Sequence, residues 1–255
     1  MDTTIALLVG IAFLAGLMDA AVGGGGLIQI PGIFSFLPNH TPAVLFGTNK
    51  FASICGTATA AREYIKKIKV PWRLILPTAL LAFIFSYLGA KVVTYIPVAW
   101  MKPAILVLLI VIGIYTFIKK DFGRLHTERA LTHKDLYIGM LIGASIGFYD
   151  GIFGPGTGSF LTFLFIRIYA FDFLHATAAA KVVNLATNFA ALSFFIPSGN
   201  ILWAFAIPMA ISNIFGGFVG ARLAILGGAK VLRICFLCLM CILISKFAYD
   251  LFFMA

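Results

Sequence analysis

Charged residues are scarce in this chain. Of its 255 residues, only 11% are Asp, Glu, Lys or Arg, whereas 62% are hydrophobic. The mean hydropathy is +1.05. A single soluble core cannot keep that much apolar surface out of water. The scarcity of charge therefore excludes an ordinary soluble domain and predicts an integral membrane protein.

Acidic residues are the rarer of the two charged kinds. Asp and Glu number 9 against 19 Lys and Arg, which gives a formal net charge of +10. Such a surplus also occurs in nucleic-acid-binding proteins. Here, however, the basic residues lie in short loops between apolar runs, the pattern that sets the topology of a membrane protein. We therefore expect a lipid bilayer around the chain and no nucleic acid partner.

Cysteine and histidine are also few, with four residues of each kind. All four Cys lie in apolar runs with no His beside them, which is typical of packing residues and not of disulfides or metal ligands. No Ser-His-Asp set, zinc-ligand spacing or nucleotide-binding loop occurs in the sequence. We therefore expect neither an enzyme nor a protein with a bound metal or cofactor.

The chain repeats itself with a shift of 131 positions and no gap. The matched pairs include Asp19 with Asp150, Gly23 with Gly154, Gly25 with Gly156, Lys50 with Lys181, Trp72 with Trp203 and Pro77 with Pro208. A single shift that aligns so many identical uncommon residues predicts two copies of one structural unit. We expect the functional site where the two copies face each other.

Five apolar segments occur in each copy. They cover 4–21, 26–37, 42–61, 74–96 and 99–118, and then 136–153, 157–168, 173–196, 202–226 and 231–253. A full span needs about 20 residues, and the first two segments of each copy are the short ones. The first of all has no basic flank, so we interpret it as structure and not as a signal peptide.

These segments predict an all-α integral membrane protein. Each copy would be a helical hairpin, which either crosses the bilayer fully or dips into it and returns, followed by three spans. The domain boundaries are then repeat one at 1–118, a cytoplasmic connector at 119–135 and repeat two at 136–255.

The loops give the orientation. Loop 62–73 holds five basic residues and one acidic residue, whereas the matching loop at 196–202 has no charge. Because Lys and Arg favour cytoplasmic loops, the first loop should be inside and the second outside. The two five-segment repeats are therefore predicted to be inverted relative to each other, with both chain termini external.

Glycine runs follow the first segment of each copy, at Gly23-Gly24-Gly25-Gly26 and at Gly154-Pro-Gly156-Thr157-Gly158. Without Cβ atoms, main-chain amides approach a ligand closely, and free amides at the start of a helix attract anions. The alternative is a tight turn between packed helices. Non-helical backbone at membrane depth is tolerated where it is buried or lines a cavity, which favours the anion site.

Two lysines lie inside apolar segments. Lys50 is nine residues into its segment, and Lys181 takes the same place in the other copy. An ammonium near the bilayer centre costs at least about 3 kcal/mol, so it needs a carboxylate or an anionic ligand. Polar residues follow each lysine at the same helical spacing, namely Ser53 and Thr57 in the first copy and Asn184 and Asn188 in the second. Asn49 adds a further donor beside Lys50.

Asp19 and Asp150 are the expected partners of these lysines. They would neutralise the ammonium groups in a structural pair, cap the free amides of the hairpin bend, or take up a proton during transport. The spacing of the residues leaves these roles open.

At this point the sequence resembles a known family. Leu14-Ala-Gly-Leu-Met-Asp19, Val22-Gly-Gly-Gly-Gly-Leu-Ile28 and Gly47-Thr-Asn-Lys50 are similar to motifs of the sulfite exporter TauE/SafE family of bacterial membrane permeases. The segment 148–158 with Ala180-Lys181 resembles that family's second half. The resemblance implies transport of sulfite, sulfoacetate and other organosulfonates, chiefly outward across the inner membrane. Ala180 stands opposite Asn49, so the two half-sites are unequal.

We therefore expect a secondary transporter of small sulfur-containing anions that works by alternating access. The alternatives are a proton- or sodium-coupled importer of sulfate- or thiosulfate-type anions, and an anion channel. The expected substrate-binding residues are Gly23, Gly24, Gly25, Gly26, Asn49, Lys50, Ser53, Gly154, Gly156, Thr157, Lys181 and Asn184. Asp19 and Asp150 are expected to serve in charge pairing or proton coupling.

Overall fold

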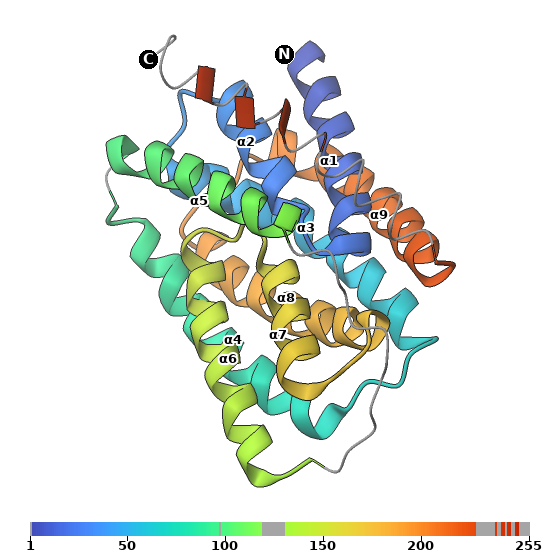
Figure 1. Cartoon of the computed structure of the whole chain (residues 1–255). Coiled ribbons are helices and arrows are strands. Elements are labelled where there is room, and N and C mark those ends of the chain that lie inside the picture. The colour runs from blue at the N-terminus through green and yellow to red at the C-terminus, as the bar shows by residue number, and fades with distance from the viewer. Residues whose placement is uncertain are drawn as a thin grey trace.

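The structure is a computed structural model that describes residues 2–96, 98–118 and 131–227, and beyond these only positions 238, 241, 242, 244, 245, 248 and 249. Within these residues the chain is all helical, without strands (Figure 1). The helices are α1 (Asp2–Val22), α2 (Gly26–Phe36), α3 (Pro42–Ile65), α4 (Trp72–Val93), α5 (Val98–Ile118), α6 (His133–Ile152), α7 (Thr157–Tyr169), α8 (Phe173–Phe195) and α9 (Trp203–Ile225). The tenth predicted segment, 231–253, and most of the connector lie outside the described residues.

Helix boundaries follow the sequence repeat. A shift of 131 carries α1, α2, α3 and α4 onto α6, α7, α8 and α9 to within about two residues at each end. The second helix of each set is short, as predicted, with 11 residues in α2 and 13 in α7. The first helix is not short, which corrects the prediction: α1 has 21 residues and α6 has 20.

Both first helices extend beyond their apolar runs at the N-terminal end. In α6 the cause is a capping box, in which the Thr132 hydroxyl accepts from the Asp135 amide and the Asp135 carboxylate accepts from Thr132. Such a box satisfies amides that the first turn leaves free. The helix therefore begins in polar sequence, ahead of the apolar run from which its start was predicted.

The two sets of helices interlock. α1 packs along α9, α4 packs along α6, and α3 packs against α8 and α9. Figure 1 shows α1 entering from the N-terminal end of the molecule and α6 from the opposite end, and both finish near its middle. The short helices α2 and α7 begin there, so the glycine runs lie deep inside the protein.

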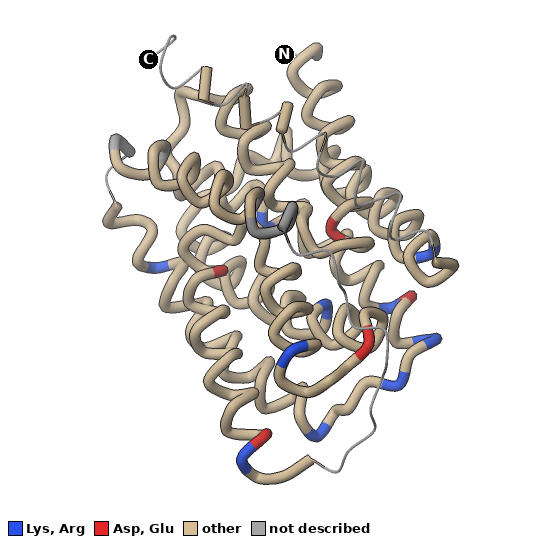
Figure 2. The backbone as a smooth tube through the Cα atoms, viewed as in Figure 1, with Lys and Arg blue, Asp and Glu red and all other residues tan. Residues whose placement is uncertain are grey.

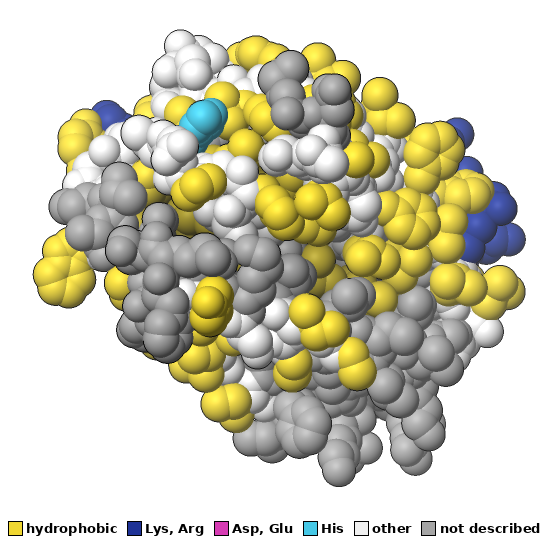
Figure 3. Space-filling model, turned by 90° about the horizontal axis from the view of Figure 1, so that it is seen from above, with side chains coloured by type: hydrophobic (Ala, Val, Ile, Leu, Met, Phe, Trp, Pro, Cys, Tyr) yellow, Lys and Arg dark blue, Asp and Glu magenta, His cyan; other side chains and the backbone are white. Residues whose placement is uncertain are grey.

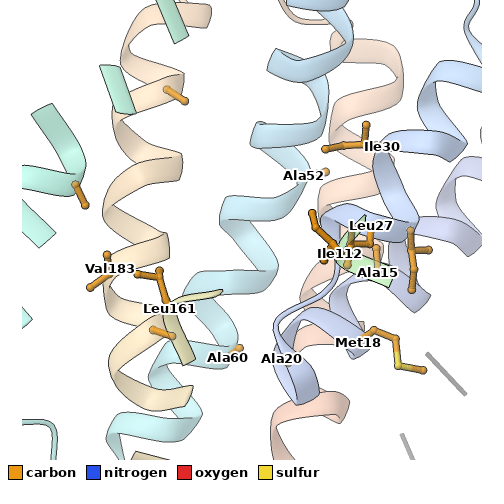
Figure 4. Close-up of a cluster of buried hydrophobic side chains, with 14 of the residues drawn as sticks. Ala15, Met18, Ala20, Leu27, Ile30, Ala52, Ala60, Ile112, Leu161 and Val183 are labelled. Atoms are coloured by element: carbon orange, nitrogen blue, oxygen red, sulfur yellow. The ribbon is translucent and has the colours of Figure 1, made fainter. Parts of the chain in front are cut away.

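Helix surfaces and the core have the composition expected of a membrane protein. Among the residues that the structure describes, four helices are long and apolar enough to cross a bilayer, at Thr3–Val22, Trp72–Val93, Phe173–Phe195 and Trp203–Ile225. Large apolar side chains are exposed on the long helices, such as Leu80 on α4, Leu141 on α6 and Phe215 on α9. Inside, small and branched residues pack together, and Figure 4 shows Ala15, Leu27 and Ile112 beside one another. The chain is thus a multi-pass membrane protein.

Charges are distributed unevenly over the molecule. Figure 2 shows most of the described Lys and Arg residues toward the end opposite the N-terminus. Figure 3 looks onto the N-terminal end, where the described surface is mainly hydrophobic or uncharged, with Lys and Arg only near its rim. The two ends of the molecule therefore differ in charge.

Glycines let the long helices approach closely. A Cβ on Gly216 or Gly220 of α9 would overlap the carbonyl oxygens of Phe13 and Leu17 on α1, and a Cβ on Gly147 of α6 would overlap the Ala82 carbonyl of α4. Small residues at such contacts are typical of membrane helices, where packing and not water drives association.

Gly220→Ala is expected to destabilise the protein by about 1–3 kcal/mol, the usual cost of overpacking a tight contact. Gly10→Ala on α1 is the matched control, because a Cβ there meets nothing within 4 Å. It should be neutral or slightly stabilising, since Ala is the better helix former. Melting temperatures in detergent measure both variants, and equal melting temperatures would contradict the predicted close contact.

Candidate functional site

Two buried ion pairs connect the copies. Lys50 Nζ on α3 lies 2.6 Å from Asp150 Oδ2 at the end of α6, and Lys181 Nζ on α8 lies 2.7 Å from Asp19 Oδ2 at the end of α1. Each lysine thus pairs with the aspartate of the other copy, and the shift of 131 carries one pair onto the other. The exposed fractions are 3% and 2% for the first pair and 1% for Lys181, whereas Asp19 retains 16%.

Threonine hydroxyls complete both pairs. Thr157 donates to Asp150 Oδ1 at 2.7 Å, and its oxygen is also 3.0 Å from the Gly154 carbonyl. Thr57 donates to Asp19 Oδ2 at 3.2 Å. The two ammonium groups and two carboxylates carry no net charge together, so the cluster is neutral as it stands.

The two glycine runs contact each other directly. A Cβ on Gly23 would lie 2.5 Å from the Gly158 carbonyl carbon, and a Cβ on Gly26 would lie 3.2 Å from Pro155 Cα. Gly23 has φ +79°, a conformation that L side chains rarely adopt. The Ser159 amide donates to the Gly23 carbonyl at 3.0 Å. The hairpin tips of the two copies are therefore bound together backbone to backbone.

Free amides lie beside this contact. Among the described residues, no acceptor is found for the N–H groups of Gly24, Gly25 and Gly26, which lead into α2. These groups and the dipole of α2 make a positive potential at the helix start. Gly154 has φ +86°, and a Cβ there would lie 3.3 Å from Lys50 Nζ. Glycine at this position lets the lysine reach the second tip.

A cavity opens at this junction. Its lining consists of Ala15, Asp19, Gly23, Gly25, Gly26, Gln29, Asn49, Lys50, Ser53, Thr57, Asp150, Gly154, Gly156, Thr157, Gly158, Asn184, Asn188 and Asn213. Ala15 is the one apolar side chain among these described residues. The free space amounts to about 20 Å³, which is room for about one water molecule. The cavity is thus polar, deep and narrow.

Most of the residues expected in the site line this cavity. Those that do so are Gly23, Gly25, Gly26, Asn49, Lys50, Ser53, Gly154, Gly156, Thr157 and Asn184, together with Asp19 and Asp150. Gly24 and Lys181 are not part of the lining. Lys181 lies behind the Asp19 carboxylate, so Lys50 is the ammonium that faces the cavity.

Two carboxamides in the lining were not predicted. Gln29 on α2 and Asn213 on α9 are buried, and Asn213 Nδ2 donates to Gln29 Oε1 at 2.8 Å. Each is a carboxamide in a mostly apolar helix, which is a signal that marks functional positions in membranes. Asn49 differs from them, because its buried Oδ1 has no hydrogen-bond partner among the described residues.

Known proteins resemble this chain over nearly its whole length. The family model described as sulfite exporter TauE/SafE matches residues 8–247. A probable membrane transporter protein of Haemophilus influenzae is 32% identical over 246 residues, which are 96% of this chain and 95% of that protein. The probable membrane transporter protein YfcA of Escherichia coli K12 is 30% identical over 94% of this chain and 88% of its own length. No solved structure matches significantly.

Proposed function

The chain belongs to the sulfite exporter TauE/SafE family of membrane transporters, and from this membership we propose that it is a secondary transporter of small sulfur-containing anions such as sulfite or organosulfonates. Lys50 is the cation that binds the anion. Asn49 and the free glycine amides donate hydrogen bonds to the oxyanion. Ser53, Asn184 and Thr157 complete the polar wall, and Lys181 acts through Asp19.

The observation that carries this proposal is the position of Lys50. Its side chain is 3% exposed and lines the same cavity as glycines of both runs, and the side chains of that cavity are polar except for Ala15. An ammonium so deep in a membrane protein is expensive. Structural pairing with Asp150 alone would not require a cavity or unbonded amides next to it, whereas an oxyanion needs both.

Alternating access between two inverted repeats is the proposed mechanism. The equivalent helix boundaries, the crossed ion pairs and the opposite directions of α1 and α6 in Figure 1 support it. Membrane transporters of this type bind substrate at the interface of the repeats. The two crossed ion pairs and the backbone contact between the glycine runs lie at the hairpin tips, and a rocking motion about the tips would open the site to one side at a time.

Charge distribution supports a cytoplasmic location for the end opposite the N-terminus. Arg222 Nε at the end of α9 lies 3.3 Å from Glu63 Oε2 at the end of α3, which places it beside the basic loop 62–73. Lys and Arg favour the cytoplasmic side. We therefore place the protein in the inner membrane of a bacterium, with its N-terminus on the external side.

Voltage would drive export of a bare anion. With the cell interior negative, each exported negative charge gains about 2.3 kcal/mol per 100 mV. Import of the same anion would need a coupled cation, and the two aspartates at the site are the observation that favours this second candidate. The direction of transport thus depends on whether a cation travels with the anion.

Anion binding to the detergent-solubilised protein tests the proposal. Sulfite, sulfate, thiosulfate, methanesulfonate, taurine and sulfoacetate are added in turn, and the melting temperature is followed. At least one of them should stabilise the wild type by about 2–3 kcal/mol at a hundredfold excess over its Kd. Lys50→Ala should abolish this response.

Lys91→Ala is the matched control, because Lys91 is exposed and outside the cavity. It should respond to the anion as the wild type does. If no anion stabilises the wild type, or if Lys50→Ala responds equally, the proposed site is wrong.

A further inference from the structure

The ammonium that faces the cavity is already bound to a carboxylate. Both oxygens of Asp150 are engaged, Oδ2 with Lys50 Nζ at 2.6 Å and Oδ1 with the Thr157 hydroxyl at 2.7 Å. The remaining space, about 20 Å³, is smaller than any sulfur oxyanion needs. An anion at Lys50 therefore either displaces the Asp150 carboxylate or lies against it as a second negative charge.

A displaced carboxylate has nowhere favourable to go. Asp150 is 2% exposed, and a buried charge without a partner is neutralised in preference to being left ionised. We propose, on the basis of the function proposed above, that Asp150 is the binding site of a co-transported proton. The anion takes over the Lys50 ammonium, and the Asp150 carboxylate takes up one proton from water to become a neutral carboxyl group.

The net charge of the site does not change in this exchange. The cluster is neutral before binding, with Lys50 and Lys181 balanced by Asp19 and Asp150. A monovalent anion adds one negative charge and the proton adds one positive charge, so the loaded site is neutral again. The anion and the proton are thus bound in a ratio of one to one.

Thr157 is placed to accommodate the added proton. Its hydroxyl oxygen lies 2.7 Å from Asp150 Oδ1 and 3.0 Å from the Gly154 carbonyl, and a hydroxyl donates only one hydrogen. With the carboxylate ionised, that hydrogen goes to Asp150. With the carboxyl protonated, the Thr157 hydroxyl turns to the Gly154 carbonyl and accepts the hydrogen of Asp150. Both protonation states are therefore satisfied without moving the backbone.

The other ionisable groups around Asp150 are not placed to take up the co-transported proton in its stead. α6 packs against α4, α7 and α8. On α4, Arg73 and Lys91 are exposed, as is Arg167 on α7. On α8, Lys181 is bound to Asp19 and His175 to Asp172. On α6 itself the Tyr149 hydroxyl donates to the Pro155 carbonyl at 2.6 Å, and Asp135 belongs to the capping box at the far end.

The geometry of the two ion pairs favours Asp150 over Asp19 as the proton site. Asp19 holds Lys181, which does not line the cavity, so an incoming anion need not break that pair. Asp19 is also the more exposed carboxylate, with 16% of its side chain accessible. The pseudo-symmetric pairs are therefore assigned different roles: Lys50–Asp150 exchanges ligands, and Lys181–Asp19 holds α8 to α1.

Binding of one proton with each anion changes the driving force for transport. A monovalent anion that travels with one proton carries no net charge, so the membrane potential does not act on its transport. The gradients of the anion and of pH then set the direction. This replaces the voltage-driven export of a bare anion as the expected energetics.

The test uses methanesulfonate, a monovalent anion whose charge does not change between about pH 6 and 8, so any pH dependence belongs to the protein. Binding is measured by titration calorimetry on the intact chain in detergent. For the wild type, affinity for methanesulfonate should rise about tenfold for each unit that the pH falls, which is the linkage expected for one bound proton. In a weakly buffered solution, a pH dye should report about one proton taken up per anion bound.

Asp150→Asn should bind methanesulfonate with an affinity that does not change with pH, and without proton uptake. Asp19→Asn is the matched comparison, and whatever affinity for methanesulfonate it retains should still rise as the pH falls. If Asp150→Asn does not fold, the proton count of the wild type still decides. Anion binding that depends on Lys50 but takes up no proton would overturn the proton site alone. The absence of any anion binding would overturn the proposed function, and the proton site with it.

Discussion

Lys50→Ala is expected to reduce anion transport to background and to lower the free energy of unfolding by about 3–5 kcal/mol, the cost of leaving one partner of a buried ion pair unpaired. The stranded charge is Asp150, which is 2% exposed and retains only the Thr157 hydroxyl. Transport should fail because no other ammonium faces the cavity among the residues that line it. Uptake of labelled anion into proteoliposomes measures the first effect, and chemical denaturation in micelles measures the second.

Exchanging the two charges separates stability from function. In Lys50→Asp/Asp150→Lys the ion pair is kept with its direction reversed, so much of the lost stability should return. Transport should stay at background, because the ammonium would then project from the end of α6 and no longer from α3 beside Asn49. Recovery of transport in the exchanged protein would show that only the pair, and not the position of the ammonium, matters for the anion.

Local patterns predicted the helices well. The apolar runs of about 20 residues and the shift of 131 indicated the helices α1 to α4 and α6 to α9, and the shortness of α2 and α7 was visible in the spacing of the glycine runs. Helix starts were less predictable. α6 begins at His133 because of the contact between Thr132 and Asp135, and a capping box in polar sequence leaves no trace in an apolar window.

Residues that line the candidate cavity were predictable where chemistry alone marks them. A lysine in an apolar helix needs a partner, and the polar residues spaced along α3 and α8 indicated which faces of these helices are turned inward. The choice of partner was not predictable. Lys50 is 100 positions from Asp150, and their contact depends on how α3 meets the end of α6. Only the packing of the two copies decides that the pairs cross.

Gln29 and Asn213 illustrate a different limit. Neither residue has a polar counterpart in the repeat, since Phe160 and Ala82 take the equivalent places. Comparison of the two copies therefore gives them no support. Their bond at 2.8 Å forms between α2 and α9, and it makes the cavity more polar on one side than the repeat implies.

Gly23→Ala is expected to reduce transport strongly and to destabilise the protein by roughly 2–5 kcal/mol, the sum of left-handed backbone strain and overpacking. Gly23 has φ +79°, and its added Cβ would lie 2.5 Å from the Gly158 carbonyl carbon and from the Ser159 amide nitrogen. These are backbone atoms, so relief of the clash requires α7 to shift. That shift would break the bond from Ser159 N–H to the Gly23 carbonyl and move the amides away from Lys50.

Gly199→Ala isolates the backbone strain from the clash. Gly199 has φ +69°, and a Cβ there meets nothing within 4 Å, so only the strain of about 1–2 kcal/mol applies. Its melting temperature should fall moderately, and its transport rate, measured in proteoliposomes beside Gly23→Ala, should stay near that of the wild type. Equal losses of transport in the two variants would mean that the contact between the hairpin tips does not position the anion site. A larger loss in Gly23→Ala follows directly if the two tips must lie backbone to backbone for Lys50 and the free amides to converge on one ligand.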